Sequence, residues 1–261
     1  MMLNRVALAT LLLFSTAALA QVGKTASPQT VLGAPTTLPI VFTQSISADH
    51  SRTGDPVSAR TSQVVHLADG STIPSGAKIA GHVVAANGFA YDKTPYVHQK
   101  QSALTIQFDS LEFQHGTLPL NVTVRAMADP ITSEHARMPL ATDVDPQGTV
   151  TQIGGDQLTP SQQEVVSRDG DVVAYNKRGG VYAHLIANRG CDGSSVEVSI
   201  GIYSASACGL YGFVSISAQE MGSEARPSTI TLVSTHGSPK IWKRSTALLE
   251  VLPEKQTIAS R

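Results

Sequence analysis

Leu104-Thr105-Ile106-Gln107-Phe108-Asp109 is the stretch that decides the fold class, because apolar and polar side chains alternate in it residue by residue. In a β-strand successive side chains point to opposite faces, so this period of two puts one face in a core and the other in water. Strands of a parallel sheet covered on both faces are apolar throughout, whereas antiparallel strands alternate. The stretch therefore predicts an antiparallel strand with one buried face.

The same alternation recurs later in the chain, in residues 120–126, 196–202, 214–218 and 229–232. Dipeptides that favour tight turns separate such runs, namely Asp69-Gly70, His115-Gly116 and Asp192-Gly193. We therefore predict a mainly β protein of about ten short strands, antiparallel and barrel- or sandwich-like, with at most one or two short helices.

The best helix signal is Thr159-Pro160-Ser161-Gln162. Thr159 is a suitable N-cap, Pro160 suits the first helical position, and Gln162 closes a capping box. We expect a short helix from Thr159 to about Ser167, with Gly170 just beyond its end.

The first residues predict a secretory signal peptide. Arg5 precedes an apolar run over residues 6–14, and Ala18-Leu19-Ala20 is the small-x-small pattern of a cleavage site. The run is short for a membrane-spanning helix, which needs about 20 apolar residues. We expect cleavage after Ala20 and export to the periplasm, the outer membrane or the cell exterior, with no transmembrane helix in the mature chain. An uncleaved anchor is the alternative.

Changes in composition divide the chain into six parts. We assign residues 1–20 to the signal peptide and the region 21–35, rich in small polar residues, to a disordered lead-in. Residues 36–128 form a predicted β-barrel-like domain, and 129–155, where proline and glycine interrupt the periodicity, a linker or long loop. A second β-rich region (156–253) and a polar tail (254–261) follow. Whether the two β regions form one domain or two is open.

The charge balance argues against nucleic acid as a partner. The chain has 19 basic and 20 acidic residues, for a net charge of −1. No strong field is expected to attract nucleic acid or an anionic membrane. Charged residues make up 15% of the chain, below the usual quarter or so, which fits a β-rich exported protein better than long solvated helices.

Two cysteines, Cys191 and Cys208, are present. An even number of cysteines in an exported chain predicts a disulfide bond. Closing a loop of this length would stabilise the fold by roughly 3 kcal/mol through the unfolded state. Two free thiols are the alternative.

An ordered series of elements in residues 36–128 resembles a known family: Leu38-Pro39-Ile40-Val41, then Gly54-Asp55-Pro56-Val57-Ser58-Ala59, then Ile73-Pro74-Ser75-Gly76-Ala77-Lys78-Ile79-Ala80-Gly81, then 104–111 with Gly116 and Leu118. The series is similar to the barrel-forming scaffold family of bacterial type IV secretion and conjugation systems (TrbI-like proteins), which shows a comparable Ile-Pro-x-Gly-small-x-apolar-x-Gly step. The resemblance implies a barrel-like scaffold module exposed to the periplasm, with envelope proteins or further copies of itself as partners. The family's cytoplasmic segment, spanning helix and pore-forming helical hairpin have no counterpart here, so a pore is not implied.

Three residues of the third element have a structural reading of their own. Pro74 cannot donate to a β-ladder and marks a strand edge or a turn. Gly76 predicts a turn, and Gly81 predicts a bulge or a close backbone approach.

Catalytic and metal-binding motifs are weak. The sequence contains neither G-x-S-x-G nor H-E-x-x-H. The segment 143–148 begins like a calcium loop but lacks the acidic residues that such a loop needs later, so we read it as a turn. A triad can be assembled on paper, as in any serine-rich chain with 8 histidines, from Ser194 or Ser234, His184 or His236, and Asp169 or Asp171. We therefore predict no catalytic residue, no metal ligand and no cofactor.

The densest polar cluster supplies the candidate binding residues, Asp169, Asp171, Asn176 and Arg178. Neighbouring glycines would allow a ligand to approach the backbone closely. The alternative is a pair of solvated turns around a short strand, which is the commoner meaning of such clusters.

Three functions stay open. The first is a non-enzymatic scaffold or assembly module of the cell envelope, favoured by the resemblance and the weak catalytic motifs. The second is an exported hydrolase acting on envelope or extracellular polymers, which a buried triad or carboxylate pair in a pocket would favour. The third is a carbohydrate- or ligand-binding β-sandwich, which exposed aromatic side chains would favour; Trp242 is the only tryptophan.

Overall fold

The computed structural model describes residues 32–253 except for 96–97, 114–115, 139–148, 156, 161–162, 168, 178–179 and 185–195. The predicted signal peptide, most of the lead-in and the tail lie outside the described residues, as does the segment 143–148. Residues 32–35, which we assigned to the lead-in, belong to the folded part. Leu32 is buried, and the N–H of Thr36 donates to the carbonyl of Gly33 over 3.0 Å.

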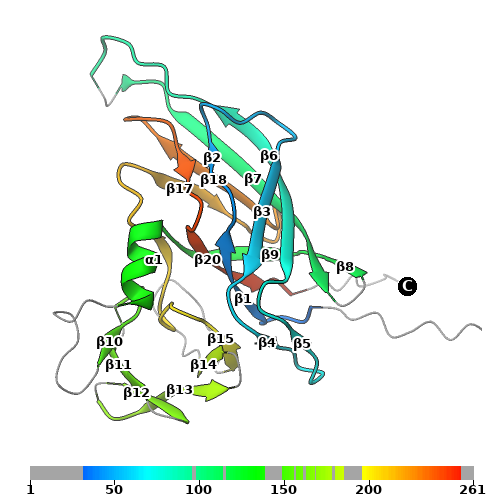
Figure 1. The fold of residues 1–261 in the computed structure, drawn as a ribbon. Coiled ribbons are helices and arrows are strands. Elements are labelled where there is room, and N and C mark those ends of the chain that lie inside the picture. The colour runs from blue at the N-terminus through cyan, green and yellow to red at the C-terminus, as the bar shows by residue number, and fades with distance from the viewer. Residues whose placement is uncertain are drawn as a thin grey trace, which may run out of the picture. The chain divides into compact units, whose positions relative to one another are not determined.

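Strands dominate the described residues, which confirms the predicted mainly β fold (Figure 1). The ten-stranded sheet contains β1 (Thr37–Phe42), β3 (Pro56–Thr61), β6 (Lys78–Asn87), β7 (Ser102–Phe113), β8 (Gly116–Pro119), β9 (Val122–Ala128), β16 (Gly209–Tyr211), β17 (Ser217–Met221), β18 (Thr229–Ser234) and β20 (Thr246–Val251). Its order is β16-β9-β20-β1-β3-β6-β7-β18-β17, with β8 paired to β7.

A second sheet has six strands in chain order, β10 (Val150–Thr151), β11 (Gln157–Pro160), β12 (Glu164–Ser167), β13 (Val172–Lys177), β14 (Gly180–His184) and β15 (Glu197–Ser199). Two short pairs complete the strands, β2 (Ile46–Ser47) with β19 (Lys240–Ile241), and β4 (Val65–His66) with β5 (Thr72–Ile73). Neighbouring strands are antiparallel except β16, which runs parallel to β9.

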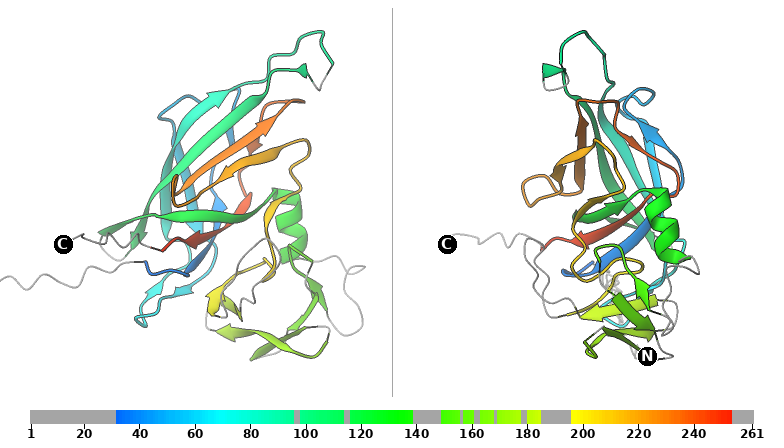
Figure 2. Two further views of the ribbon diagram at one scale, coloured as in Figure 1. Left: turned by 180° about the vertical axis from the view of Figure 1, so that it is seen from behind. Right: turned by 90° about the vertical axis from the view of Figure 1, so that its left-hand side faces the viewer.

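The ten-stranded sheet curls until its two ends approach each other, so that it forms a nearly closed barrel (Figure 2). The Oγ1 atom of Thr123 on β9 lies 2.9 Å from the carbonyl oxygens of both Met221 and Gly222, at the end of β17. The N–H of Ser228 donates to the carbonyl of Val122 over 2.7 Å. These bonds connect β9, the neighbour of the end strand β16, with the end of β17 and with the residue before β18.

Alternate residues of the strands fill the interior of this barrel. Leu104, Ile106 and Phe108, the residues predicted to be buried, are each at most 1% exposed. The rings of Phe42 and Phe108 lie with their centroids 6.1 Å apart. Burial of one such side chain stabilises the folded state by about 1.5–3 kcal/mol, so the packed interior holds the barrel together.

Pro74, Gly76 and Gly81, for which we predicted a turn and a bulge or close backbone approach, lie beside β5 and in β6. Pro74 directly follows β5, and its carbonyl accepts from the hydroxyl of Thr61 over 2.7 Å. Gly76 has a φ of 85°, a backbone angle that residues other than glycine rarely adopt. A Cβ atom on Gly81 would lie 2.2 Å from the carbonyl oxygen of Gln107, and the register shifts at this glycine.

The prediction of a helix from Thr159 to about Ser167 is wrong. This segment contains strands β11 and β12, which pair as a hairpin. Leu158 and Val165 are buried on the same side in a shared apolar cluster. The β-branched pair Val165 and Val166 favours a strand, and the tertiary contact outweighs the capping signal.

The observed helix, α1 (Pro130–Arg137), lies where we predicted a linker or long loop. Asp129 is its N-cap and accepts from the N–H of Thr132 over 2.7 Å, and Pro130 occupies the first turn. The side chain of Ser133 is fully buried and lies 2.6 Å from the carbonyl oxygen of Asp129. The Asp-Pro start was therefore a usable helix signal.

The sheets do not follow the two predicted sequence regions. Strand β18 pairs with β7, and β20 lies between β1 and β9, so residues from the region 156–253 complete the sheet that begins in the region 36–128. The predicted strand over residues 214–218 begins only at Ser217, and Val214 is 85% exposed in the preceding turn. Within the described part of the chain, no helix has both the length and the apolar character needed to cross a membrane.

Candidate functional site

The structure separates Asn176 from Asp169 and Asp171, the other described members of the predicted polar cluster. Asp169 and Asp171 are exposed in the turn between β12 and β13, where the N–H of Ser167 donates to the carbonyl of Asp171 over 2.8 Å. Asn176 lies five residues further along β13, a separation of about 16 Å in a strand. Arg178 lies outside the described residues. Of the described members of this cluster, Asn176 lines a hollow between the two sheets.

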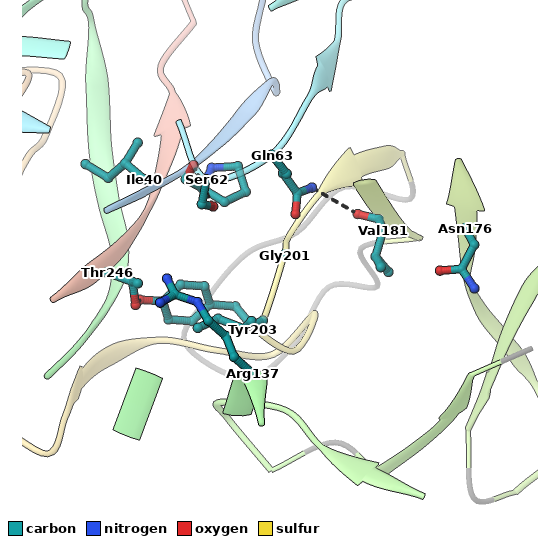
Figure 3. Close-up of a pocket in the computed structure, with 11 residues that line it drawn as sticks. Ile40, Ser62, Gln63, Arg137, Asn176, Val181, Gly201, Tyr203 and Thr246 are labelled. Atoms are coloured by element: carbon teal, nitrogen blue, oxygen red, sulfur yellow. Dashed lines mark hydrogen bonds between the residues drawn. The ribbon is translucent and has the colours of Figure 1, made fainter. Parts of the chain in front are cut away.

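This hollow, of about 390 Å³, lies where the six-stranded sheet packs against the barrel (Figure 3). Its eleven lining residues come from both sheets and from the end of α1: Pro39, Ile40, Ser62, Gln63, Arg137, Asn176, Val181, Gly201, Ile202, Tyr203 and Thr246.

Apolar packing and a few long-range hydrogen bonds hold the walls of this hollow. Leu248 of the barrel shares an apolar cluster with Ile153 and Ile200. The side-chain amide of Gln63 donates to the carbonyl of Val181 over 3.4 Å, as Figure 3 shows. The positions of the lining residues are therefore set by both sheets at once.

Tyr203 forms the buried floor of the hollow. Its ring is 1% exposed, and its hydroxyl lies 2.6 Å from Oγ1 of Thr246 on β20. The same Oγ1 atom lies 2.9 Å from the hydroxyl of Ser133 on α1. Burial raises the pKa of the Tyr203 hydroxyl well above its ordinary value. The phenol therefore stays neutral and joins three elements rather than transferring protons.

Arg137 is exposed at the mouth of this hollow, and Figure 3 shows its guanidinium beside Tyr203. As the last residue of α1, it lies where the helix dipole favours a positive charge. The same side chain, with Ser62, also lines a neighbouring hollow of about 410 Å³. We call the joint surface of these two hollows the arginine-lined hollow.

The neighbouring hollow adds two further arginines from different elements. Arg60 lies on β3 opposite Val41 of β1. Arg244 lies in the turn before β20, where its N–H donates to the carbonyl of Phe42 over 2.9 Å. The φ of Arg244 is 73°, a conformation that glycine or asparagine usually adopts in turns.

The three arginines give this surface an excess of positive charge. Glu134 is the one carboxylate among the described residues that line either hollow. Among the described residues, no carboxylate lies within 4.0 Å of the Arg60, Arg137 or Arg244 guanidinium. The ion pairs of the described part of the chain are Lys78–Glu112, His82–Asp109 and Arg125–Glu250. Three guanidinium groups against one carboxylate attract an anion, and each guanidinium can bind a carboxylate or phosphate with two parallel hydrogen bonds.

The described lining of the arginine-lined hollow carries groups that are suited to binding anions. Its titratable groups are the three guanidiniums, Glu134 and Tyr203, and the described lining residues include no imidazole and no thiol. A guanidinium keeps its proton throughout the ordinary pH range. The exposed hydroxyls of Ser62 and Ser75 line the same surface and add neutral hydrogen-bonding groups.

The serine-hydrolase combination does not assemble from the described residues. Ser234 and His236 lie at the end of β18, whereas Asp169 and Asp171 lie in a turn of the other sheet. Ser194 lies outside the described residues, as does the His184 side chain. No group of three or more histidine, cysteine or acidic side chains suited to a metal ion occurs in the part of the chain that the structure describes.

The predicted disulfide between Cys191 and Cys208 stays a prediction, because Cys191 lies outside the described residues. The arginines were not predicted from the sequence. Arg60, Arg137 and Arg244 stand far apart in it, and no local motif marks them.

Comparison of the chain with protein-family models, with curated proteins and with solved structures finds no match. The resemblance to the secretion-system scaffold family therefore stays a prediction.

Proposed function

We propose that this chain is a non-enzymatic binding and assembly module of a bacterial cell envelope, and that its arginine-lined hollow holds an acidic segment of a partner protein. One observation carries the proposal. Arg60, Arg137 and Arg244 come from three places in the fold to one surface, and the described residues of that surface include one carboxylate, Glu134.

The geometry favours an acidic protein segment over a small enclosed ligand. The two hollows share Ser62 and Arg137, so together they offer a continuous surface lined by three cations from separate places in the fold. Consecutive carboxylates on a peptide can contact separate guanidiniums, and nearby hydroxyls can bond to the peptide backbone. Binding of this kind is electrostatic and exposed, so it should weaken as salt is added.

Two further features support a non-enzymatic role. The barrel interior is filled by apolar side chains, so the barrel itself offers a rigid support for surface groups. The described lining of the arginine-lined hollow contains no imidazole and no thiol, and its one phenol, Tyr203, is buried and bonded to Thr246. The predicted signal peptide and the resemblance of residues 36–128 to envelope scaffolds support the proposed location.

The test is the size of the native complex in gently solubilised envelope fractions, read by native gel after crosslinking. We compare the wild-type chain with the double variant Arg137→Gln/Arg244→Gln. The matched control is Lys93→Gln/Lys100→Gln, which removes two exposed cations from the connection between β6 and β7.

The wild-type chain and the lysine control are expected in a large complex, and the arginine variant as a monomer. A wild-type chain that runs as a lone monomer would contradict assembly. A complex that survives the arginine substitutions would show that assembly uses another surface.

A further inference from the structure

A third hollow, of about 640 Å³, is separate from the arginine-lined hollow and shares no lining residue with it. Three chain segments and Asp129, the N-cap of α1, form it: residues 47–50 from the end of β2, 212–216 between β16 and β17, and 234–242 around β19. It combines an exposed aromatic ring, an exposed apolar turn and a set of hydrogen-bonding side chains.

Trp242 supplies the aromatic surface and is 41% exposed. The ammonium of Lys240 lies 3.7 Å from the centroid of the indole ring. Such a cation–π contact favours one orientation of the ring before any ligand arrives. The electron-rich face of an indole attracts the weakly positive C–H groups on the face of a sugar ring.

Val214 supplies the apolar turn and is 85% exposed, although valine is an unusual residue for a turn. Both flanks of this turn have left-handed backbone, with a φ of 76° at Gly212 and 58° at Ser215. A Cβ atom on Gly212 would lie 2.4 Å from Oδ1 of Asp129, so the turn is held tightly against the start of α1. Val214, with Phe213 behind it, offers a fixed apolar contact for a small group such as a methyl.

Asp49 supplies a carboxylate to the lining of the hollow. Its carboxylate accepts a hydrogen bond from the hydroxyl of Ser238, whose own oxygen accepts from the N–H of Phe89 over 2.7 Å. A carboxylate oxygen has room for a second donor, such as a ligand hydroxyl. The imidazoles of His50 and His236 line the same hollow and add donors and acceptors.

The charge in this hollow differs from that of the arginine-lined hollow. Lys240 is balanced by the carboxylates of Asp49 and Asp129, so an anion finds no net attraction there. We infer that this hollow binds a neutral N-acetylated amino sugar, with the sugar ring on Trp242, a hydroxyl on Asp49 and the acetyl methyl against Val214. The inference does not depend on the proposed assembly role.

Trp242 is the only tryptophan in the chain, so intrinsic fluorescence reports on this hollow directly. The experiment titrates the full exported chain with chitotetraose, a tetramer of N-acetylglucosamine, and with cellotetraose, which has the same ring linkage and no acetamido group. For a variant that lacks Trp242, and therefore lacks the fluorescence signal, calorimetry measures the binding instead.

Chitotetraose is expected to change the Trp242 emission in a saturable way and to bind at least about tenfold more tightly than cellotetraose. Val214→Ser should weaken chitotetraose binding about fivefold, because it removes apolar contact with the methyl group. Trp242→Ala should abolish the heat of binding. Tyr91→Ser, which removes an aromatic ring that is 72% exposed elsewhere, should leave binding unchanged.

Either of two results overturns the inference. One is unchanged emission and no heat with chitotetraose for the wild-type chain. The other is equal affinity for the two oligosaccharides, because the acetyl group would then make no contact of its own.

Discussion

Arg125 on β9 is the charged side chain whose removal should harm the fold most. It is 5% exposed, and its guanidinium donates to the carbonyls of Ala205 over 2.6 Å and of Ala207 over 3.3 Å. Its third partner is the carboxylate of Glu250 on β20, at 3.4 Å. Arg125 therefore joins two barrel strands to the segment between β15 and β16.

Arg125→Met keeps most of the side-chain volume and removes the charge and every hydrogen-bond donor. The Glu250 side chain, 19% exposed, then loses its cation, and two carbonyls lose a donor. Breaking a buried ion pair from one side costs about 3–5 kcal/mol. Because Glu250 keeps some contact with water, we expect a loss of about 3 kcal/mol in the free energy of unfolding.

The matched control is Lys78→Met. The ammonium of Lys78 lies 3.3 Å from Glu112, a separation close to that of the buried pair, but these side chains are 76% and 57% exposed. Exposed pairs contribute about 0–1 kcal/mol, so this variant should unfold almost like the wild type. Urea denaturation at pH 7 measures both variants. A loss below about 1 kcal/mol for Arg125→Met, or equal losses for the two, would refute the reasoning.

Three further predictions concern the barrel and its second region. Gly81→Ala should reduce the free energy of unfolding by about 1–3 kcal/mol, because the new Cβ overlaps the backbone of β7. The control is Gly237→Ala, where nothing lies within 4 Å of the added Cβ, so the same urea titration should show little change in the free energy of unfolding. Burial raises the pKa of the Glu250 carboxyl above its ordinary value of 4.5, so the folded state holds that proton more tightly than the unfolded state. The wild type should therefore lose stability relative to Glu250→Gln as the pH rises from below 4.5 through the folded-state pKa, and an opposite trend in melting temperature would contradict this. Reduction should lower the melting temperature if Cys191 and Cys208 are bonded, and native alkylation of both thiols with no change in melting would exclude the bond.

The strands could be predicted because their signals are local. Alternation in Leu104, Ile106 and Phe108 reports directly which face is buried, and the structure buries all three. Gly76 and Gly81 were informative for the same reason, since a turn and a bulge each depend on the backbone at one residue. A fold class built from such signals follows from the sequence alone.

The two helix assignments show where local signals conflict with packing. Thr159-Pro160 and Asp129-Pro130 both resemble the start of a helix, yet only the second begins one. The difference lies in the residues that come after each of these starts. Val165 pairs with Ala174 in a sheet and is buried, whereas the residues of α1 are largely exposed around a single buried serine. Propensity is a weak prior that such contacts override.

The candidate site could not be predicted, because its parts meet only through long-range pairing. Arg60 reaches the site through the register of β3 with β1, and Arg244 through the turn that leads into β20. Arg137 joins them because α1 lies against β20, where Ser133 contacts Thr246. Asp171 and Asn176 show the opposite case: they lie close in sequence, but the extended strand β13 holds them apart.

The most direct test of the central claim is the binding of labelled hexaglutamate to the purified chain, measured by fluorescence anisotropy at low and high salt. The account predicts binding that weakens with salt, that falls about tenfold in Arg137→Gln/Arg244→Gln, and that is unchanged in Lys93→Gln/Lys100→Gln. Equal affinity in the wild type and the arginine variant, or no binding at low salt, would contradict it.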